Sequence, residues 1–200
     1  VLNWRTITDA TAPSQPNSMF ASDTTVATFG RVYGSLLTIA GGVTYVDVDY
    51  DIKYNTEVQD ARTGFDGTSF EYSVDGSGSH FATADAIDFT LRYDHYLTRN
   101  TGGTSNGDRQ GWAGDSGGWK HMHLRIPGLA GHTFLPRFSM ASDASAGGGG
   151  VWIDNVVINA VTMGCGTCTS TGVGESGGTI DAQATLSLRA VGANPFTGAT

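Results

Sequence analysis

A chain of 200 residues is long enough to bury a sizeable hydrophobic core in one domain and is short for a two-domain enzyme. The formal net charge is −8, and only two of the 11 basic residues are lysines, so the chain has no basic surface for a phosphate backbone, which argues against nucleic-acid binding. Glycine, with 29 residues, has about twice its usual share, which favours many short strands joined by turns.

Alternating apolar and polar residues predict strands along most of the chain. In residues 46–54 the even positions are apolar and the odd positions charged, so one face of this strand should meet a core and the other water. The predicted strands, in chain order, are residues 36–39, 46–54, 70–74, 87–93, 121–126, 133–140 and 151–158. No segment of a dozen residues has a capped helical period. We therefore predict an all-β fold, an antiparallel jelly-roll β-sandwich over residues 1–160.

The C-terminal part of the sequence has a different composition. Residues 161–181 are rich in Gly, Ser and Thr and have almost nothing to bury, so we interpret them as a linker. They contain both cysteines, Cys165 and Cys168, whose surroundings favour a small local disulfide in an exported protein, with free thiols as the alternative. Residues 182–200 begin a further strand, which either docks on the main body or opens a following domain.

Features of the whole chain indicate an exported protein. No apolar run approaches the roughly 20 residues that a membrane-spanning helix needs, and we expect no membrane insertion. Val1 is neither an initiator Met nor part of a signal peptide, so we expect the chain to be a mature form or a fragment of a longer precursor. The expected location is extracellular or at the cell surface.

One short motif resembles a catalytic loop. Residues 114–118, Gly-Asp-Ser-Gly-Gly, match the nucleophile loop of chymotrypsin-like serine proteases. That mechanism also needs a His base and an orienting Asp in a longer chain, and neither His80 nor His95 has the expected context. We interpret the motif as a Gly-rich loop and predict no enzyme activity. Replacing Ser116, taken as exposed, by Ala is then expected to change stability by no more than about 0.5 kcal/mol.

Two further groups of residues are candidates for ligand contact. His121 and His123 lie two apart on one predicted strand face and form a possible metal pair, with a solvated polar face as the alternative. The indole faces of Trp112 and Trp119 could stack on sugar rings while neighbouring polar groups bond sugar hydroxyls. The alternative is that both indoles belong to the hydrophobic core. The candidate ligand-binding residues are Trp112, Trp119, Asp108 and Arg109.

The carboxylates point to calcium, which takes hard oxygen ligands. Asp47, Asp49 and Asp51 share one strand face and repel one another unless a cation or solvent screens them. Other acids fall at predicted strand ends or in loops, where calcium sites are commonly built: Glu57, Asp60, Asp66, Asp75 and Asp154. Two acids of a glycosidase pair cannot be selected from so many without geometry. We expect calcium to stabilise the fold.

Six motifs in order resemble the MAM-like jelly-roll modules of secreted bacterial proteins, over roughly residues 4–160. These modules include the cleaved-adhesin domains of gingipain-type proteins and the accessory domains of immune-inhibitor-A-type metallopeptidases. The motifs are Asn-Ser-Met-Phe-Ala-Ser-Asp at 17–23, Tyr-Asn-Thr-Glu at 54–57, the stretch 65–76 beginning Phe-Asp-Gly, Gly-Trp-Ala-Gly-Asp-Ser-Gly-Gly-Trp at 111–119, Ser142-Asp143, and Gly-Val-Trp-Ile-Asp-Asn-Val at 150–156.

The resemblance implies a non-catalytic, calcium-stabilised module for adhesion or carbohydrate binding, with an extracellular polysaccharide or surface protein as its partner. It places Asp154 on a last core strand, where related jelly rolls bind calcium with an early carboxylate. The Phe-Glu that often opens such modules is absent before Trp4, so either Asp23 substitutes or the early ligand lay in the precursor. The expected metal ligands are Asp154, Asp23, Glu57 and Asp49.

Trp152 and Asp154 alternate onto the same side of the strand 151–158. We hypothesise that Trp152 packs into the end of the sandwich while Asp154 holds a cation at its rim. Residues 186–200 resemble the opening strand of the immunoglobulin-like C-terminal domains that serve export or anchoring.

Two functional alternatives remain. One is a self-associating surface or filament subunit whose strand 182–190 pairs with a neighbour's open edge. The other is an accessory domain of a secreted metallopeptidase.

Overall fold

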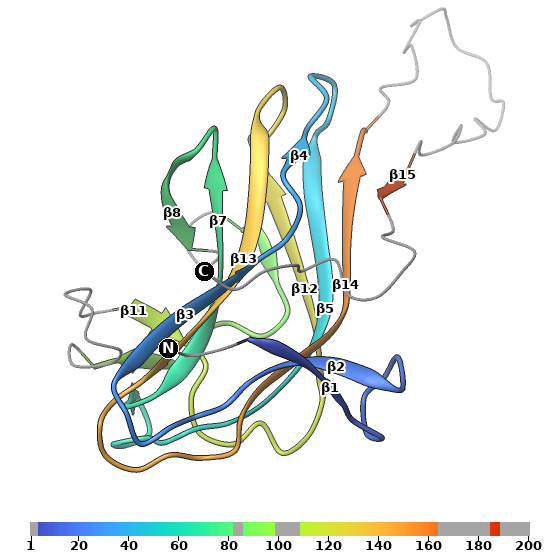
Figure 1. The fold of residues 1–200 in the computed structure, drawn as a ribbon. Coiled ribbons are helices and arrows are strands. Elements are labelled where there is room, and N and C mark those ends of the chain that lie inside the picture. Colours follow the sequence, from blue (N-terminus) through green and yellow to red (C-terminus); the bar gives the residue numbers. More distant parts are fainter. Residues whose placement is uncertain (1–3, 82–85, 99–108, 164–184, 189–200) are drawn as a thin grey trace, which may run out of the picture.

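The computed structural model describes residues 4–81, 86–98, 109–163 and 185–188, and these residues form strands and loops without a helix. Two large, antiparallel sheets pack against each other (Figure 1), which confirms the prediction of an all-β sandwich. None of the described segments forms a helix that is long and apolar enough to cross a membrane.

The first sheet has the strand order β1-β2-β14-β5-β12-β9, and β15 pairs with β14 beside β2. Its strands are β1 (Arg5–Thr8), β2 (Asn17–Ala21), β5 (Tyr45–Asn55), β9 (Asp88–Phe89), β12 (Lys120–Pro127), β14 (Gly150–Val161) and β15 (Thr185–Leu188). The long central strand β5 pairs with β12 on one side and with β14 on the other. A bulge between Asp154 and Val157 interrupts the register of β14.

The second sheet has the order β3-β13-β7-β8, and β4 also pairs with β13. Its strands are β3 (Thr28–Tyr33), β4 (Leu37–Thr38), β7 (Gly67–Val74), β8 (Ser77–Phe81) and β13 (Thr133–Ser142). A small third sheet contains β6 (Thr63–Gly64), β10 (His95–Leu97) and β11 (Arg109–Gly111), with β6 parallel to β10. The strands predicted at 36–39 and 87–93 are present only as the two-residue strands β4 and β9.

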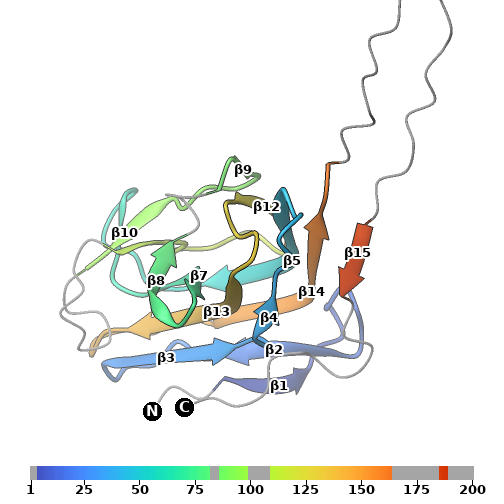
Figure 2. The same ribbon diagram turned by 90° about the horizontal axis from the view of Figure 1, so that it is seen from above.

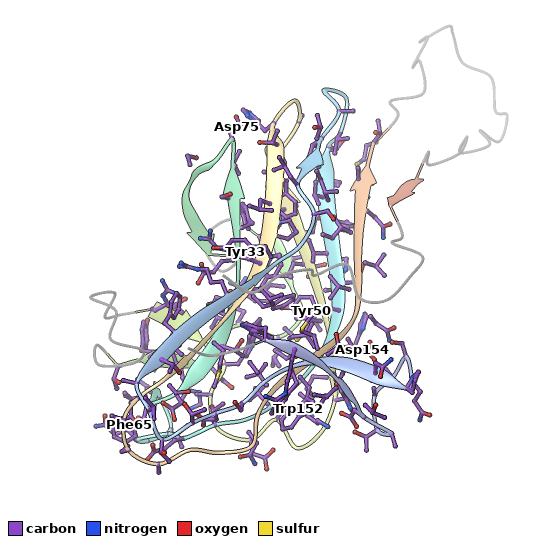
Figure 3. All side chains as sticks on the ribbon, in the orientation of Figure 1. Tyr33, Tyr50, Phe65, Asp75, Trp152 and Asp154 are labelled. Carbon is purple, nitrogen blue, oxygen red and sulfur yellow. The ribbon has the colours of Figure 1, made fainter. Side chains whose placement is uncertain are left out.

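The hydrophobic core lies between the two large sheets. The even residues of β5, from Val46 to Ile52, are completely buried, as the alternation predicts. The Tyr50 ring contacts Phe138 of the opposite sheet edge-on at 4.9 Å, and Figure 3 shows Tyr50 pointing into this interior. Such contacts between the two inner faces hold the sheets against each other.

Three acidic residues of β5 lie on its outer face and are paired with basic side chains of β12. The pairs are Asp47 with Arg125 at 2.7 Å, Asp49 with His123 at 2.7 Å, and Asp51 with His121 at 3.0 Å. Because strands β5 and β12 are antiparallel, each carboxylate lies opposite its partner in register. Arg125 therefore neutralises Asp47, whereas Asp49 and Asp51 contact the two histidines of the candidate metal pair, which carry charge only when protonated.

Strand β7 departs from the predicted pattern of one wet face. Its alternation predicts that Glu71 faces water, yet Glu71 is 0% exposed. The carboxylate is hydrogen-bonded by three guanidinium groups: Arg31 Nε at 3.3 Å, Arg109 Nη1 at 2.8 Å and Arg137 Nε at 2.9 Å. This prediction was wrong because residues from β3, β11 and β13 cover the outer face of β7 and neutralise its buried charge.

Candidate metal centre

Four carboxylates from four separate segments converge at one end of the sandwich. Asp23 follows β2, Glu57 follows β5, Asp66 precedes β7 and Asp143 follows β13 directly. Oxygen atoms of Glu57, Asp66 and Asp143 lie within 4.8 Å of one another. The backbone N–H groups of Phe65 and Asp66 both donate to the Glu57 carbonyl at 3.1 Å, so strand ends distant in sequence are held side by side. Phe65 is labelled at the lower end of Figure 3.

Asp66 lies at the centre of this cluster and has an unusual environment. Its side chain is 0% exposed, and one carboxylate oxygen, Oδ2, has no hydrogen-bond partner. The other oxygen, Oδ1, accepts a short hydrogen bond from the backbone N–H of Asp143. Burial, together with the neighbouring carboxylates of Asp23 and Asp143, raises the pKa of Asp66 to about 8. A cation beside Oδ2 would supply the partner that this oxygen lacks and would offset the repulsion between Asp66 and the neighbouring carboxylates.

Asp23 is held next to Asp66 by the loop between β13 and β14. Its Oδ1 accepts a hydrogen bond from Ser142 Oγ at 3.0 Å, and its Oδ2 accepts one from Gly148 N at 2.8 Å. The last part of the loop can approach this closely because residues 147–150 are glycines: a Cβ at Gly148 would lie 2.5 Å from the Asn55 carbonyl oxygen. A Cβ at Gly150 would lie 2.3 Å from that of Ala21, and φ of Gly150 is +117°.

Glu57 and Asp143 complete the cluster at its more exposed side. Ser145 donates its backbone N–H to Asp143 Oδ1 at 2.7 Å, and its hydroxyl lies 3.2 Å from Glu57 Oε2. The same hydroxyl is 2.8 Å from Asp143 Oδ1, so it bridges the two carboxylates. The side chains that could bind a metal are thus oriented by backbone and hydroxyl donors.

The chemistry of the donor set fits calcium. Calcium takes six to eight oxygen ligands at about 2.4 Å, and the oxygens of Glu57, Asp66 and Asp143, all within 4.8 Å of one another, are close enough to contact one ion together. The cluster contains only oxygen donors and no nitrogen or sulfur, which disfavours zinc. Four carboxylates exceed the charge of one divalent cation and repel one another where no cation neutralises them.

The sequence-predicted metal ligands do not all meet in the structure. Glu57 is one of the three carboxylates whose oxygens lie within 4.8 Å of one another. Asp23 adjoins them: its Oδ2 accepts a hydrogen bond from the Glu57 N–H at 3.4 Å, and its carboxylate neighbours Asp66. Asp49 lies on the outer face of β5, paired with His123. Asp66 was recognised only as one of several loop acids, and Asp143 only as part of a resemblance motif. The positions of Asp66 and Asp143 in the sequence could have identified them as candidate ligands, because each directly adjoins a strand end.

Asp154 lies elsewhere and is satisfied by protein donors. It accepts hydrogen bonds from Ser14 N at 2.7 Å, from Ser14 Oγ, and from Asn155 N at 2.8 Å. Figure 3 shows Asp154 beside β2, on the other side of the sandwich end from Phe65. The structure therefore supplies partners for this buried carboxylate without a cation.

Trp152 also differs from its predicted position. It lies on the outer face of the first sheet, where its ring centroid is 4.9 Å from that of Phe20. The ammonium group of Lys53 lies 4.5 Å from the ring centroid of Trp152 and 5.0 Å from that of Trp119. The inward positions of β14 are instead Val151 and Ile153, which are both fully buried.

The candidate ligand-binding residues that the structure describes do not form one site. Trp112 is 0% exposed and packs on Tyr93 in the core, so its indole offers no face to a sugar. Arg109 is buried against Glu71. Trp119 is half-buried at the surface and donates its Nε1–H to Thr11 Oγ1 at 3.3 Å. Asp108 and the proposed disulfide residues Cys165 and Cys168 lie outside the described residues.

Ser116 of the protease-like motif has a structural role. Its hydroxyl accepts a hydrogen bond from Tyr54 N at 3.0 Å and donates one to the Gly118 carbonyl at 2.8 Å. The side chain is buried, so the premise that it is an exposed hydroxyl was wrong.

We now expect Ser116→Ala to lower the free energy of unfolding by about 1–2 kcal/mol, because the Tyr54 N–H loses its buried acceptor. Chemical denaturation measures this change. The control is Ser77→Ala at the exposed first residue of β8, which should cost less than Ser116→Ala. Equal losses for the two variants would contradict the assignment.

Comparison with protein-family models and with curated proteins gives no match to the chain. The chemistry of the carboxylate cluster is therefore inferred from the geometry of its own residues.

Proposed function

We propose that the chain is a non-catalytic, calcium-stabilised β-sandwich module that serves adhesion or carbohydrate binding in an exported bacterial protein. The observation that carries the proposal is the buried carboxylate of Asp66, whose Oδ2 has no partner within a cluster of three further acids. An uncompensated buried carboxylate costs several kcal/mol, and a divalent cation is the partner that oxygen ligands in this arrangement favour.

Asp23, Glu57, Asp66 and Asp143 would hold the ion, and its chemistry here is electrostatic cross-linking. These residues belong to the loops that follow β2, β5 and β13 and to the segment that enters β7. Neutralising their charges would fix three loops at one end of the sandwich. Loops positioned by a rigid scaffold are where binding modules commonly contact ligands, which links the cation to ligand binding.

The absence of catalysis is supported by the surroundings of Ser116, whose hydroxyl donates to a backbone carbonyl rather than to a base. Adhesion or carbohydrate binding is supported by the six ordered motifs that resemble MAM-like modules. Of the sequence-predicted ligand residues that the structure describes, Trp119 keeps part of its indole at the surface. A half-exposed indole beside polar groups suits contact with a sugar ring.

A glycan array probed with the chain in calcium and in excess chelator tests the function. We expect retention on a polysaccharide in calcium, reduced at least tenfold by chelator, because the loops lose their common cation. Trp119→Ala should reduce retention without changing the calcium response. Retention that is identical with and without chelator would separate ligand binding from the cation, and no retention on any glycan would favour a surface protein as the partner.

A further inference from the structure

The outer edge of β14 is divided between two short strands. Along its inner side β14 pairs with β5 from Gly150 to Val161. On the other side, β2 pairs with residues 151–153 and β15 with residues 158–161. Figure 2 shows β15 beside the upper half of β14, on the side away from β5. Among the described strands, β15 alone covers this upper edge, residues 158–161, called here the upper β14 edge.

The connection between β14 and β15 is far longer than their pairing requires. Neighbouring antiparallel strands are usually joined by two to five residues, whereas residues 162–184 separate these two. The sequence of this connection is rich in Gly, Ser and Thr. The 23 residues of this connection can span at most roughly 80 Å, which is far more than a hairpin requires. Its length therefore does not restrict β15 to the β14 strand of its own chain.

The pairing itself is not specific to one molecule. It consists of four antiparallel residue pairs, from Ile158 opposite Leu188 to Val161 opposite Thr185. Every copy of the chain offers the same edge and the same strand, so β15 of one copy can form these pairs on another without any new contact. An uncovered edge presents unpaired N–H and C=O groups, which a strand from a second chain satisfies.

We propose that the upper β14 edge is a strand-exchange site and that its occupant is β15 of a second copy of the chain. The pairing within one chain competes with the pairing between chains through the effective concentration of the tethered strand, which is of roughly millimolar order for linked partners. Dilute chains pair within themselves. Chains crowded to a comparable local concentration, as in a dense surface layer, exchange β15 and become linked. This self-association is independent of the carboxylate cluster at the opposite end of the sandwich.

Cysteine pairing across the two strands tests the exchange. Asn159 and Ser187 are directly opposite, and residues so placed have Cβ atoms about 4.5–5.5 Å apart, within reach of a disulfide. Full chains with Cys165 and Cys168 replaced by Ser receive either Asn159→Cys or Ser187→Cys, and one chain is isotope-labelled. Oxidation of the mixture is expected to give a mixed disulfide dimer whose yield rises more than tenfold between about 10 µM and 1 mM protein.

Two controls make the result decisive. The Ser187→Cys chain mixed with Thr8→Cys, on β1 at the edge of the same sheet, measures random collision, and equal yields there would overturn the proposal. One chain with both Asn159→Cys and Ser187→Cys should form its disulfide internally at about 10 µM. Internal disulfides without mixed dimers at 1 mM would show that exchange does not occur. Failure to form either product would remove the β14–β15 pairing and the proposal with it.

Discussion

Glu71→Gln is expected to lower the free energy of unfolding by about 3–5 kcal/mol, among the largest effects of any single substitution in this chain. Glu71 is fully buried and accepts hydrogen bonds from Arg31, Arg109 and Arg137. Glutamine has nearly the same shape but lacks the negative charge, and its amide N–H groups would face guanidinium donors. The variant therefore leaves positive charge gathered on the outer face of β7 without its central carboxylate.

The matched control is Asp47→Asn, which removes the bidentate partner of Arg125 on the outer face of β5. The Arg125 side chain is 35% exposed, so water can solvate it when the pair is broken. We expect a loss of about 1 kcal/mol for this variant. Urea denaturation of both variants gives the comparison. Similar small losses for the two would mean that the guanidinium groups around Glu71 are compensated in another way.

Strands β5 and β7 also show what sequence patterning can predict. The alternation of residues 46–54 correctly predicted β5, because one of its faces meets the core and the other carries cross-strand pairs. The same reasoning failed for the outer face of β7. Its covering residues are remote in sequence: Arg31 lies 40 residues from Glu71, and Arg109 lies 38 residues from it. Periodicity reports the two faces of a strand, but not what other segments place on them.

The carboxylate cluster was predicted only in part for a similar reason. Composition and resemblance indicated calcium and identified Asp23 and Glu57, but Asp66 and Asp143 are 77 residues apart and are joined by a backbone hydrogen bond. Asp154 resembled a ligand because a buried carboxylate needs a partner. The partner turned out to be Ser14, 140 residues away. Acid types and strand ends are visible in a sequence, whereas the pairing of loops at one end of a sandwich depends on the strand order.

Asp66→Asn is expected to stabilise the calcium-free chain and to remove most of the effect of calcium on stability. At neutral pH the wild type should melt several degrees lower in chelator than in calcium, because binding to the folded state alone adds about 2.7 kcal/mol at a hundredfold excess over Kd. Asn is neutral, and its amide can donate to the Asp23 carboxylate. In chelator the variant should therefore melt above the wild type, while calcium should raise its melting temperature little.

The pH dependence in chelator tests the same group by a second route. The pKa of Asp66 in the folded chain, about 8, lies above the ordinary value of 3.8, so the folded state favours the protonated carboxyl. Its contribution to stability is complete below about pH 4 and is lost as the pH rises through about 8. Calcium-free wild type should thus lose stability over this range, and Asp66→Asn should lose less.

The control for both measurements is Asp154→Asn, which removes a buried carboxylate bonded to Ser14 and Asn155 outside the cluster. We expect this variant to melt below the wild type by the same amount in calcium and in chelator, because Asp154 is satisfied by protein donors. If Asp154→Asn abolished the calcium response and Asp66→Asn kept it, the ion would bind at Asp154, as the resemblance implied, and the four-carboxylate cluster would lose its assignment.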